Sequence, residues 1–216
     1  MPTNPPQNRH NMFVVIEGLD GAGTTTQTAL LADALRNSGY TVHETREPSD
    51  GPIGVLIRQA LTQRTVTRDG NRLDPAAIAL LFAADRVDHL RDEVEPALRD
   101  GAVVLTDRYV HSSVAYQGSE CDVDWVLEIN ARATTADLVV FVDVPVDECL
   151  RRIDARGERE LFEKRSFLEQ VAARYETAFT RRDAPIVRVD GTRAIQDVHA
   201  EVLEAVEDRL TKFNRC

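Results

Sequence analysis

The sequence predicts a three-layer α/β/α fold around a five-stranded parallel sheet, and three observations support this prediction. Five short runs of the chain are almost continuously apolar, which is typical of strands buried on both faces. Segments with helical periodicity alternate with these runs, which favours parallel strands joined by crossover helices. The chain has 216 residues, 43% of them hydrophobic and 29% charged, so it can enclose one sizeable core.

The expected strands and helices follow one another in a regular order. Strands are expected at residues 13–17, 40–45, 102–107, 138–143 and 186–190. Helices are expected at residues 24–38, 74–98, 145–153, 168–179 and 195–210. The first helix carries an apolar stripe that includes Leu31 and Leu35, and it ends at Gly39. Asp74 and Pro75 supply an N-cap and a first helical residue for the second helix.

A single domain is expected over residues 12–211, because the chain shows neither an internal repeat nor a long linker. Residues 1–11 are expected to form a disordered N-terminal tail, and residues 212–216 a short C-terminal tail. Two polar stretches interrupt the pattern of the domain. Residues 63–72 are expected to form a surface loop, and residues 155–165, with seven charges, a mobile flap.

Charge and cysteine content argue against several classes of protein. Asp and Glu number 36 against 26 Lys and Arg, which gives a net charge of -10. A nucleic-acid polymer is therefore not an expected partner, because binding its phosphates requires a basic face. No apolar run approaches the roughly 20 residues of a membrane span, and the chain starts without the apolar stretch of a secretory signal. Cys121, Cys149 and Cys216 form no metal or disulfide pattern, so a cytoplasmic protein with reduced thiols is expected.

A glycine-rich segment, residues 18–26, lies between the first expected strand and the first expected helix. Glycines let the backbone curl so that its N–H groups and the helix N-terminus face a phosphate. The segment fits the pattern G-x-x-x-x-G-K-[ST] except that Thr24 replaces the lysine. By itself it could be a glycine-rich turn without a ligand. The residues expected to bind the phosphates of ATP are Gly18, Gly21, Ala22, Gly23, Thr24, Thr25 and Thr26.

Two side chains are candidates for a Mg²⁺ site. Thr25 stands where the hydroxyl that binds Mg²⁺ belongs in the phosphate-loop pattern. Asp107 ends an apolar strand, which is the position of the Walker B-type carboxylate that helps to hold Mg²⁺. An aspartate at a strand end is also a common cap or turn residue, so Asp107 alone does not identify a metal site.

Several segments together resemble the thymidylate kinase family, whose members phosphorylate dTMP. Residues 13–27 match the opening strand of this family and its G-x-D-G-x-G loop, and residues 45–48 match its T-R-E-P turn. Residues 81–86 with His89 match its L-F-A-A-D-R-x-x-H helix, and residues 107–117 match its D-R-Y-x-x-S-x-x-A-Y-Q signature. The last two segments are highly specific in combination, and the resemblance extends over nearly the whole chain.

The resemblance implies a P-loop kinase fold with a short lid at about residues 154–165. It also implies that the enzyme transfers the γ-phosphate of ATP to dTMP with Mg²⁺, forming dTDP for dTTP biosynthesis. Thr25 and Asp107 would hold the Mg²⁺. A homodimer is a further implication, and the helix expected at residues 74–98 could supply its interface.

The acceptor site implied by the resemblance is consistent with the residue spacing. Phe82, Arg86 and His89 share one helix face, so a pyrimidine could stack on Phe82 while Arg86 donates to a base carbonyl or to a phosphate. Phe82 could instead be an ordinary core residue. Tyr116 would crowd a 2′-hydroxyl and so favour deoxyribose. The residues expected to bind dTMP are Asp20, Glu47, Pro48, Arg58, Phe82, Arg86, Arg108, Ser112, Ser113, Tyr116 and Gln117.

The missing loop lysine raises the question of which groups assist catalysis. Phosphoryl transfer requires positioning and neutralisation of charge on the moving group. One branch of the family supplies arginine from its lid, so Arg156 or Arg159 is expected to cover part of the lysine's role. Arg152 and Arg193 are expected on the adenine side, although Arg152 could be a charge on a helix surface. The expected catalytic residues are Asp20, Arg108, Arg156 and Arg159.

Two alternatives remain open from the sequence. The protein could be a non-catalytic or weakly active nucleotide-binding homologue, because Thr24 stands where the lysine belongs. It could also be a kinase for another nucleoside monophosphate, which a preference for dTMP over dUMP would exclude. Asp20, Arg86, Arg108 and Gln117 are all present, and this argues for an active enzyme.

Overall fold

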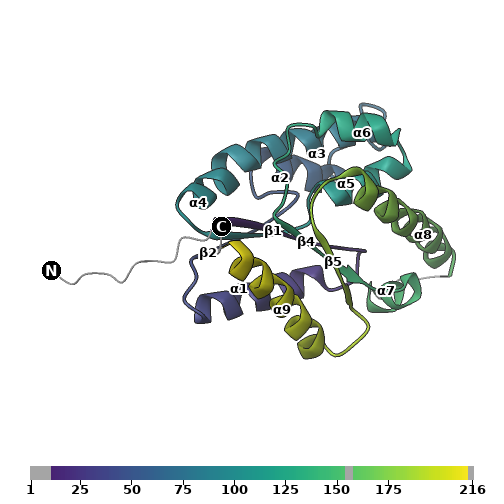
Figure 1. The fold of residues 1–216 in the computed structure, drawn as a ribbon. Helices are drawn as coiled ribbons and strands as arrows, with labels where there is room; N and C mark the ends of the chain where they lie inside the picture. The colour runs from purple at the N-terminus through teal and green to yellow at the C-terminus, as the bar shows by residue number, and fades with distance from the viewer. Residues whose placement is uncertain (1–10, 154–157, 214–216) are drawn as a thin grey trace.

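The computed structural model describes residues 11–153 and 158–213, and its centre is a sheet of five parallel strands (Figure 1). The strands lie in the order β2-β3-β1-β4-β5. Their bounds are β1 Met12–Gly18, β2 Val42–Arg46, β3 Val103–Asp107, β4 Leu138–Asp143 and β5 Ile186–Asp190. The predicted five-stranded parallel sheet is therefore confirmed. The predicted tail at residues 1–11 lies outside the described residues apart from Asn11.

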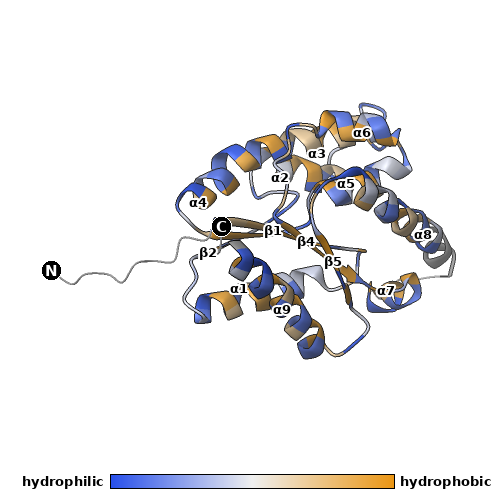
Figure 2. Ribbon diagram, viewed as in Figure 1, coloured by the Kyte–Doolittle hydropathy of each residue, from blue (hydrophilic) through white to orange (hydrophobic). Residues whose placement is uncertain are grey.

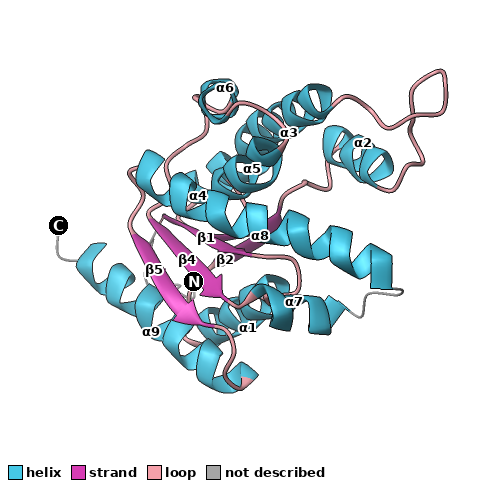
Figure 3. Cartoon of the chain, turned by 90° about the vertical axis from the view of Figure 1, so that its right-hand side faces the viewer, coloured by secondary structure: helices cyan, strands magenta, loops and turns pink. Residues whose placement is uncertain are grey.

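Helices cover both faces of the sheet, as the predicted three-layer fold requires. Helices α1 and α9 lie on one face, and α3, α5, α6 and α8 on the other (Figures 1 and 3). The longer helices are α1 Thr24–Asn37, α2 Pro52–Leu61, α3 Pro75–His89, α8 Glu158–Arg181 and α9 Ile195–Phe213. The shorter ones are α4 Glu95–Arg99, α5 Val110–Tyr116, α6 Val123–Ile129 and α7 Val146–Ile153. A π-helical turn, Leu90–Val94, joins α3 to α4.

Alternate residues of the central strand separate two hydrophobic cores. Val14 and Ile16 of β1 point to the side of α1 and α9, and Phe13 and Val15 point to the side of α5 and α6. All four side chains are almost fully buried. Figure 2 shows the strands mainly in hydrophobic orange and the outer helix surfaces in blue. Among the described residues, no helix combines the length and the apolar character needed to cross a bilayer.

The charged stretch predicted as a flap is largely helical. Residues 158–165 form the first two turns of α8, and residues 154–157 lie outside the described part of the chain. The prediction placed this helix near residue 168, about ten residues too late, because it treated high charge as a sign of irregular structure. Glu, Arg, Lys and Leu are all strong helix formers, so charge density alone does not end a helix.

The sequence patterns missed three helices, α2, α5 and α6. Pro52 occupies the first turn of α2, where the lack of a proline N–H is tolerated. Helix α5 has buried side chains on several sides, among them the polar His111 and Ser113, so it shows no simple apolar stripe. The N-cap predicted for α3 is confirmed, since Asp74 Oδ1 accepts a hydrogen bond of 2.8 Å from the Ala76 N–H.

The carboxyl ends of the central strands bring the sequence motifs together. Ile16 of β1 and Arg46 of β2 both lie in register with Asp107 of β3. The glycine-rich loop after β1, the turn after β2 and the segment after β3 therefore meet at one edge of the sheet. In open α/β folds this edge is where ligands bind.

Candidate active site

The glycine-rich loop has the backbone shape of an anion-binding turn. It runs from the end of β1 to the start of α1, and Gly21 and Gly23 adopt positive φ angles of 85° and 96°. A Cβ atom on Gly21 would lie 2.6 Å from the carbonyl oxygen of Cys149, so the site has no room for a side chain. The N-terminal N–H groups of α1 open into this loop, as phosphate binding requires.

Thr24 is inside the loop rather than reaching over it. Its side chain is buried, and a Cβ atom on Gly18 would lie 2.9 Å from the Thr24 Cγ2 methyl group. The carbonyl oxygen of Thr24 accepts a 2.9 Å hydrogen bond from the Thr28 hydroxyl. The residue at the lysine position therefore packs beneath the loop and supplies no charge to it.

Thr25 and Asp107 form a pair suited to Mg²⁺. The Thr25 hydroxyl donates to Asp107 Oδ2 at 2.5 Å. The other carboxylate oxygen, Asp107 Oδ1, is buried and has no hydrogen-bond partner within the described part of the chain. No cluster of three or more His, Cys, Asp or Glu side chains suited to a metal occurs among the described residues. Mg²⁺ characteristically uses one or two protein oxygens together with water and substrate phosphates, so this sparse donor set fits it.

Arg108 joins the phosphate loop to a neighbouring pocket. Its guanidinium donates to the Gly18 carbonyl oxygen at 3.0 Å, to the Ser112 hydroxyl at 3.2 Å and to Asp20 Oδ1 at 2.6 Å. The same group lies 5.1 Å from the centre of the Tyr116 ring. Burial opposes its charge, but the surrounding tyrosine oxygens and the Asp20 carboxylate outweigh burial and raise the pKa of Arg108. Arg108 therefore remains a cation at the junction of the two sites.

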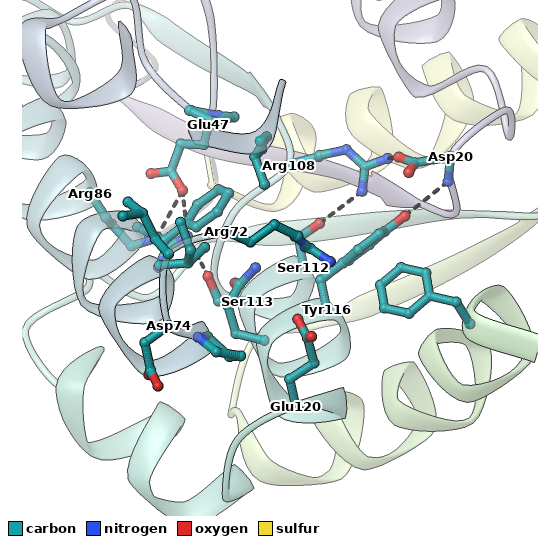
Figure 4. Close-up of a pocket in the computed structure, with 18 of the residues that line it drawn as sticks. Asp20, Glu47, Arg72, Asp74, Arg86, Arg108, Ser112, Ser113, Tyr116 and Glu120 are labelled. Atoms are coloured by element: carbon teal, nitrogen blue, oxygen red, sulfur yellow. Dashed lines mark hydrogen bonds and ion pairs between the residues drawn. The ribbon is translucent and has the colours of Figure 1, made fainter. Parts of the chain in front are cut away.

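A pocket of about 910 Å³ adjoins Arg108 (Figure 4). It is lined by ten of the eleven residues that were predicted to bind dTMP, namely Asp20, Glu47, Pro48, Phe82, Arg86, Arg108, Ser112, Ser113, Tyr116 and Gln117. Sequence reasoning missed ten further lining residues: Leu61, Asn71, Arg72, Leu73, Asp74, Pro75, Ile78, Tyr109, Glu120 and Phe167. The structure thus gathers residues from widely separated motifs around one cavity.

Arg58, the eleventh predicted residue, does not line this pocket. Its guanidinium donates to the carbonyl oxygens of Pro48 and Ser49 at 2.8 Å and 2.7 Å, so it supports the turn after β2. Arg46, in the T-R-E-P turn that ends β2, forms an exposed ion pair of 2.7 Å with Asp50. Neither arginine lines the pocket.

A buried ion pair forms the inner wall of the pocket. Arg86 donates to Glu47 Oε2 through Nε at 2.9 Å and through Nη2 at 2.6 Å. Arg86 also donates to Ser113 at 3.0 Å and to the side chain of Asn130. Burial opposes the charge on His89, but the nearby carboxylate of Glu47 outweighs it and raises the pKa of this imidazole. The face shared by Phe82, Arg86 and His89 is therefore split, with His89 facing Glu47 rather than the cavity.

A second buried network lies under the phosphate loop and was not predicted. Glu17 is fully buried and accepts hydrogen bonds from the Ser112 hydroxyl at 2.5 Å and from the Tyr109 N–H at 2.9 Å. The hydroxyl of Tyr175, on α8, lies 3.0 Å from both Glu17 Oε2 and the Gly18 carbonyl oxygen. Burial raises the pKa of Glu17. A lone acid in the otherwise apolar run of β1 is the sequence signal that could have revealed this network.

The arginines that were predicted to lie near ATP have different environments. Arg152 donates to the carbonyl oxygens of Ala22 at 3.3 Å and Gly191 at 2.9 Å, and so connects the phosphate loop to the turn after β5. Arg193 forms an ion pair with Glu201. Arg156 lies outside the described residues, and Arg159 is within α8, where its side chain is not among those described.

Comparisons with known proteins agree with this geometry. A family model described as "Thymidylate kinase" matches residues 16–202. A "Probable thymidylate kinase" of Caldivirga maquilingensis is 40% identical over 200 residues, which cover 92% of this chain and 94% of that protein. Proteins of the same description from Thermococcus gammatolerans and Pyrococcus horikoshii are 40% and 38% identical, each over 92% of this chain and 97% of their own length. The chain therefore belongs to the thymidylate kinase family of enzymes.

Proposed function

We propose that this enzyme transfers the γ-phosphate of ATP to dTMP in the presence of Mg²⁺, giving dTDP for dTTP biosynthesis in the cytoplasm. The position of Arg108 carries this proposal. Its guanidinium contacts the phosphate loop at Gly18 and also lines the neighbouring pocket. A donor phosphate on the loop and an acceptor phosphate in the pocket would meet at this one cation, as in-line transfer requires.

The pocket supplies groups suited to a pyrimidine deoxynucleotide. Phe82 offers an aromatic face for stacking. Gln117 Oε1 is buried and has no hydrogen-bond partner in the part of the chain that the structure describes, so it can accept from the ring N–H of thymine. The Tyr116 ring stands beside Arg108, where it would crowd a 2′-hydroxyl. The donor nucleotide would place its adenine between Arg152 and Arg193.

The chemistry requires little beyond positioning and charge neutralisation. The attacking atom is already a phosphate oxygen, so no strong general base is needed. Thr25 and Asp107 would hold Mg²⁺, which would neutralise charge on the donor phosphates. Arg108 would orient the acceptor phosphate, and its ion pair with Asp20 keeps that carboxylate from repelling the nucleotide. Arg156 or Arg159 would cover part of the role of the missing loop lysine.

Steady-state turnover of dTMP with Mg-ATP tests the proposal. The wild-type enzyme is expected to turn over at an ordinary kinase rate, about 1–100 s⁻¹, and to prefer dTMP to dUMP. Arg159→Ala is expected to reduce kcat by about 10²–10³, because it removes a charge-stabilising donor. Thr24→Lys is not expected to raise kcat by a comparable factor. The proposal fails if the wild type is silent and Thr24→Lys restores activity, since the protein would then be a nucleotide-binding homologue disabled at one position.

We also propose that the enzyme is a homodimer whose interface lies on α3. Leu80 and Val87 occupy one face of α3 and are 50% and 40% exposed, and the adjacent α2 exposes Val55 and Leu56. Exposed apolar side chains on two neighbouring helices are typical of a subunit contact.

Replacement of Leu80 and Val87 by glutamate is expected to convert the dimer to a monomer, because unpaired carboxylates would be buried in the contact. Light scattering after size exclusion measures the mass. Ile195→Glu, which changes a 57% exposed residue at the start of α9, is the matched control and is expected to stay dimeric. A wild-type enzyme that elutes as a monomer at micromolar concentration would exclude this interface.

A further inference from the structure

The outer wall of the acceptor pocket is formed by the loop between α2 and α3, which none of the sequence motifs covers. Asn71, Arg72 and Leu73 of this loop line the cavity. The loop is closed by hydrogen bonds from the Thr67 N–H to the Asn71 carbonyl oxygen at 2.9 Å and from the Asn71 N–H to the Thr67 hydroxyl at 3.1 Å. Asp74 then caps α3. Arg72 is therefore held between a closed turn and a helix cap.

The other two cations that line the pocket are already engaged by protein groups. Arg86 is paired with Glu47 and bonded to Ser113, and less than 2% of its surface is exposed. Arg108 is paired with Asp20 and bonded to the Gly18 carbonyl oxygen. Each of these ion pairs sums to zero charge, so together they leave little net attraction for an incoming anion.

Arg72 differs from these two arginines in its contacts. Among residues 11–153 and 158–213, no hydrogen bond, ion pair or ring contact engages its guanidinium, which is exposed. Asp74 and Glu120 line the same pocket and add two negative charges to the wall. Figure 4 shows Arg72 among the residues that line the pocket, together with Arg86 and Arg108. The four carboxylates and three arginines of the lining sum to a charge of -1, and without Arg72 the sum would be -2. The loss of Arg72 would therefore strengthen the repulsion of a nucleoside monophosphate, which itself carries negative charge.

We propose that Arg72 is a substrate-binding residue that pairs with the phosphate group of the acceptor nucleotide. The inference rests on the proposed function and adds a residue to it. An arginine fork suits a phosphate because it donates two parallel hydrogen bonds. Because Arg72 contacts neither the phosphate loop nor the donor side of the site, its contribution is to ground-state binding and not to the chemical step. It lowers the KM for dTMP and leaves kcat unchanged.

Arg72→Gln tests this assignment. We expect the KM for dTMP and its Kd by calorimetry to rise by about tenfold or more, because a charged hydrogen bond is lost. The kcat and the KM for ATP are expected to stay within about twofold of the wild type. Arg72→Lys should recover part of the loss, since it keeps the charge without the fork. Arg68→Gln is the matched control, because Arg68 is on the same loop but does not line the pocket.

Thymidine distinguishes a phosphate contact from a base contact. Arg72→Gln should bind thymidine as the wild type does, and the dTMP affinity of the wild type should fall with salt more steeply than that of the variant. An unchanged Kd for dTMP, or an equal loss for thymidine and dTMP, would overturn the assignment. Calorimetry needs no turnover, so a wild-type enzyme that binds dTMP but is inactive would refute the proposed function and leave the assignment of Arg72 standing.

Discussion

Arg108→Gln is expected to lower kcat/KM for dTMP by about 10²–10³, because it removes the donor placed where the two phosphates would meet. The loss has two parts. Hydrogen bonds from the guanidinium to the Gly18 carbonyl oxygen and the Ser112 hydroxyl disappear, and the Asp20 carboxylate loses its partner beside the substrate phosphates. Steady-state kinetics with Mg-ATP measure the effect.

The control for Arg108 is Arg36→Gln on α1, which makes the same change at an exposed ion pair. This variant is expected to keep wild-type kinetics. Arg108→Lys should be intermediate, because an ammonium keeps the charge but cannot reach several acceptors at once. A loss smaller than about tenfold in Arg108→Gln would show that Arg108 is not the group that orients the phosphates.

Arg86→Met is expected to lower the free energy of unfolding by about 3–5 kcal/mol, the largest stability effect expected for this protein. The substitution keeps much of the side-chain volume but leaves the Glu47 carboxylate buried without its guanidinium partner. Asn130 and Ser113 lose a donor at the same time. Urea denaturation followed by circular dichroism measures the change.

The double variant Glu47→Gln/Arg86→Met should regain part of this stability, because it removes the unpaired charge. Arg99→Met breaks an exposed ion pair with Glu95 and is the matched control, expected to cost at most about 1 kcal/mol. If Arg86→Met is no more destabilising than Arg99→Met, the Glu47–Arg86 pair is not a structural element of the pocket wall.

Hydrophobic pattern was sufficient for the parts of the fold that are apolar. The strand Leu138–Asp143 was predicted at its observed bounds, and the first helix within one residue, since burial on both sides of a sheet leaves continuous apolar runs. Helix α5 escaped prediction because it has no such apolar run. Its polar side chains, such as Ser112 and Ser113, point into networks formed by other elements and break the helical stripe.

The candidate site likewise contains residues that the sequence predicted and residues that it did not. The family motifs predicted Phe82 and Gln117 because each belongs to a short, specific run of residues. Tyr175 and Arg72 were missed because their significance arises only in three dimensions. Tyr175 is 157 residues from the glycine whose carbonyl oxygen its hydroxyl approaches. Arg72 lies in a polar loop that is indistinguishable by composition from any solvated turn.

The Tyr175 contact also connects α8 to the phosphate loop. The hydroxyl group is held beside Glu17 and Gly18 at the root of the phosphate loop, and the helix extends from there to Glu158, 17 residues away. At 1.5 Å per residue this stretch of α8 is about 25 Å long, so a tilt of about 10° at Tyr175 would move its far end by about 4 Å. Phe167 lies on α8 between Glu158 and Tyr175 and lines the same pocket as Arg108. The same small rotation would therefore change the width of that pocket.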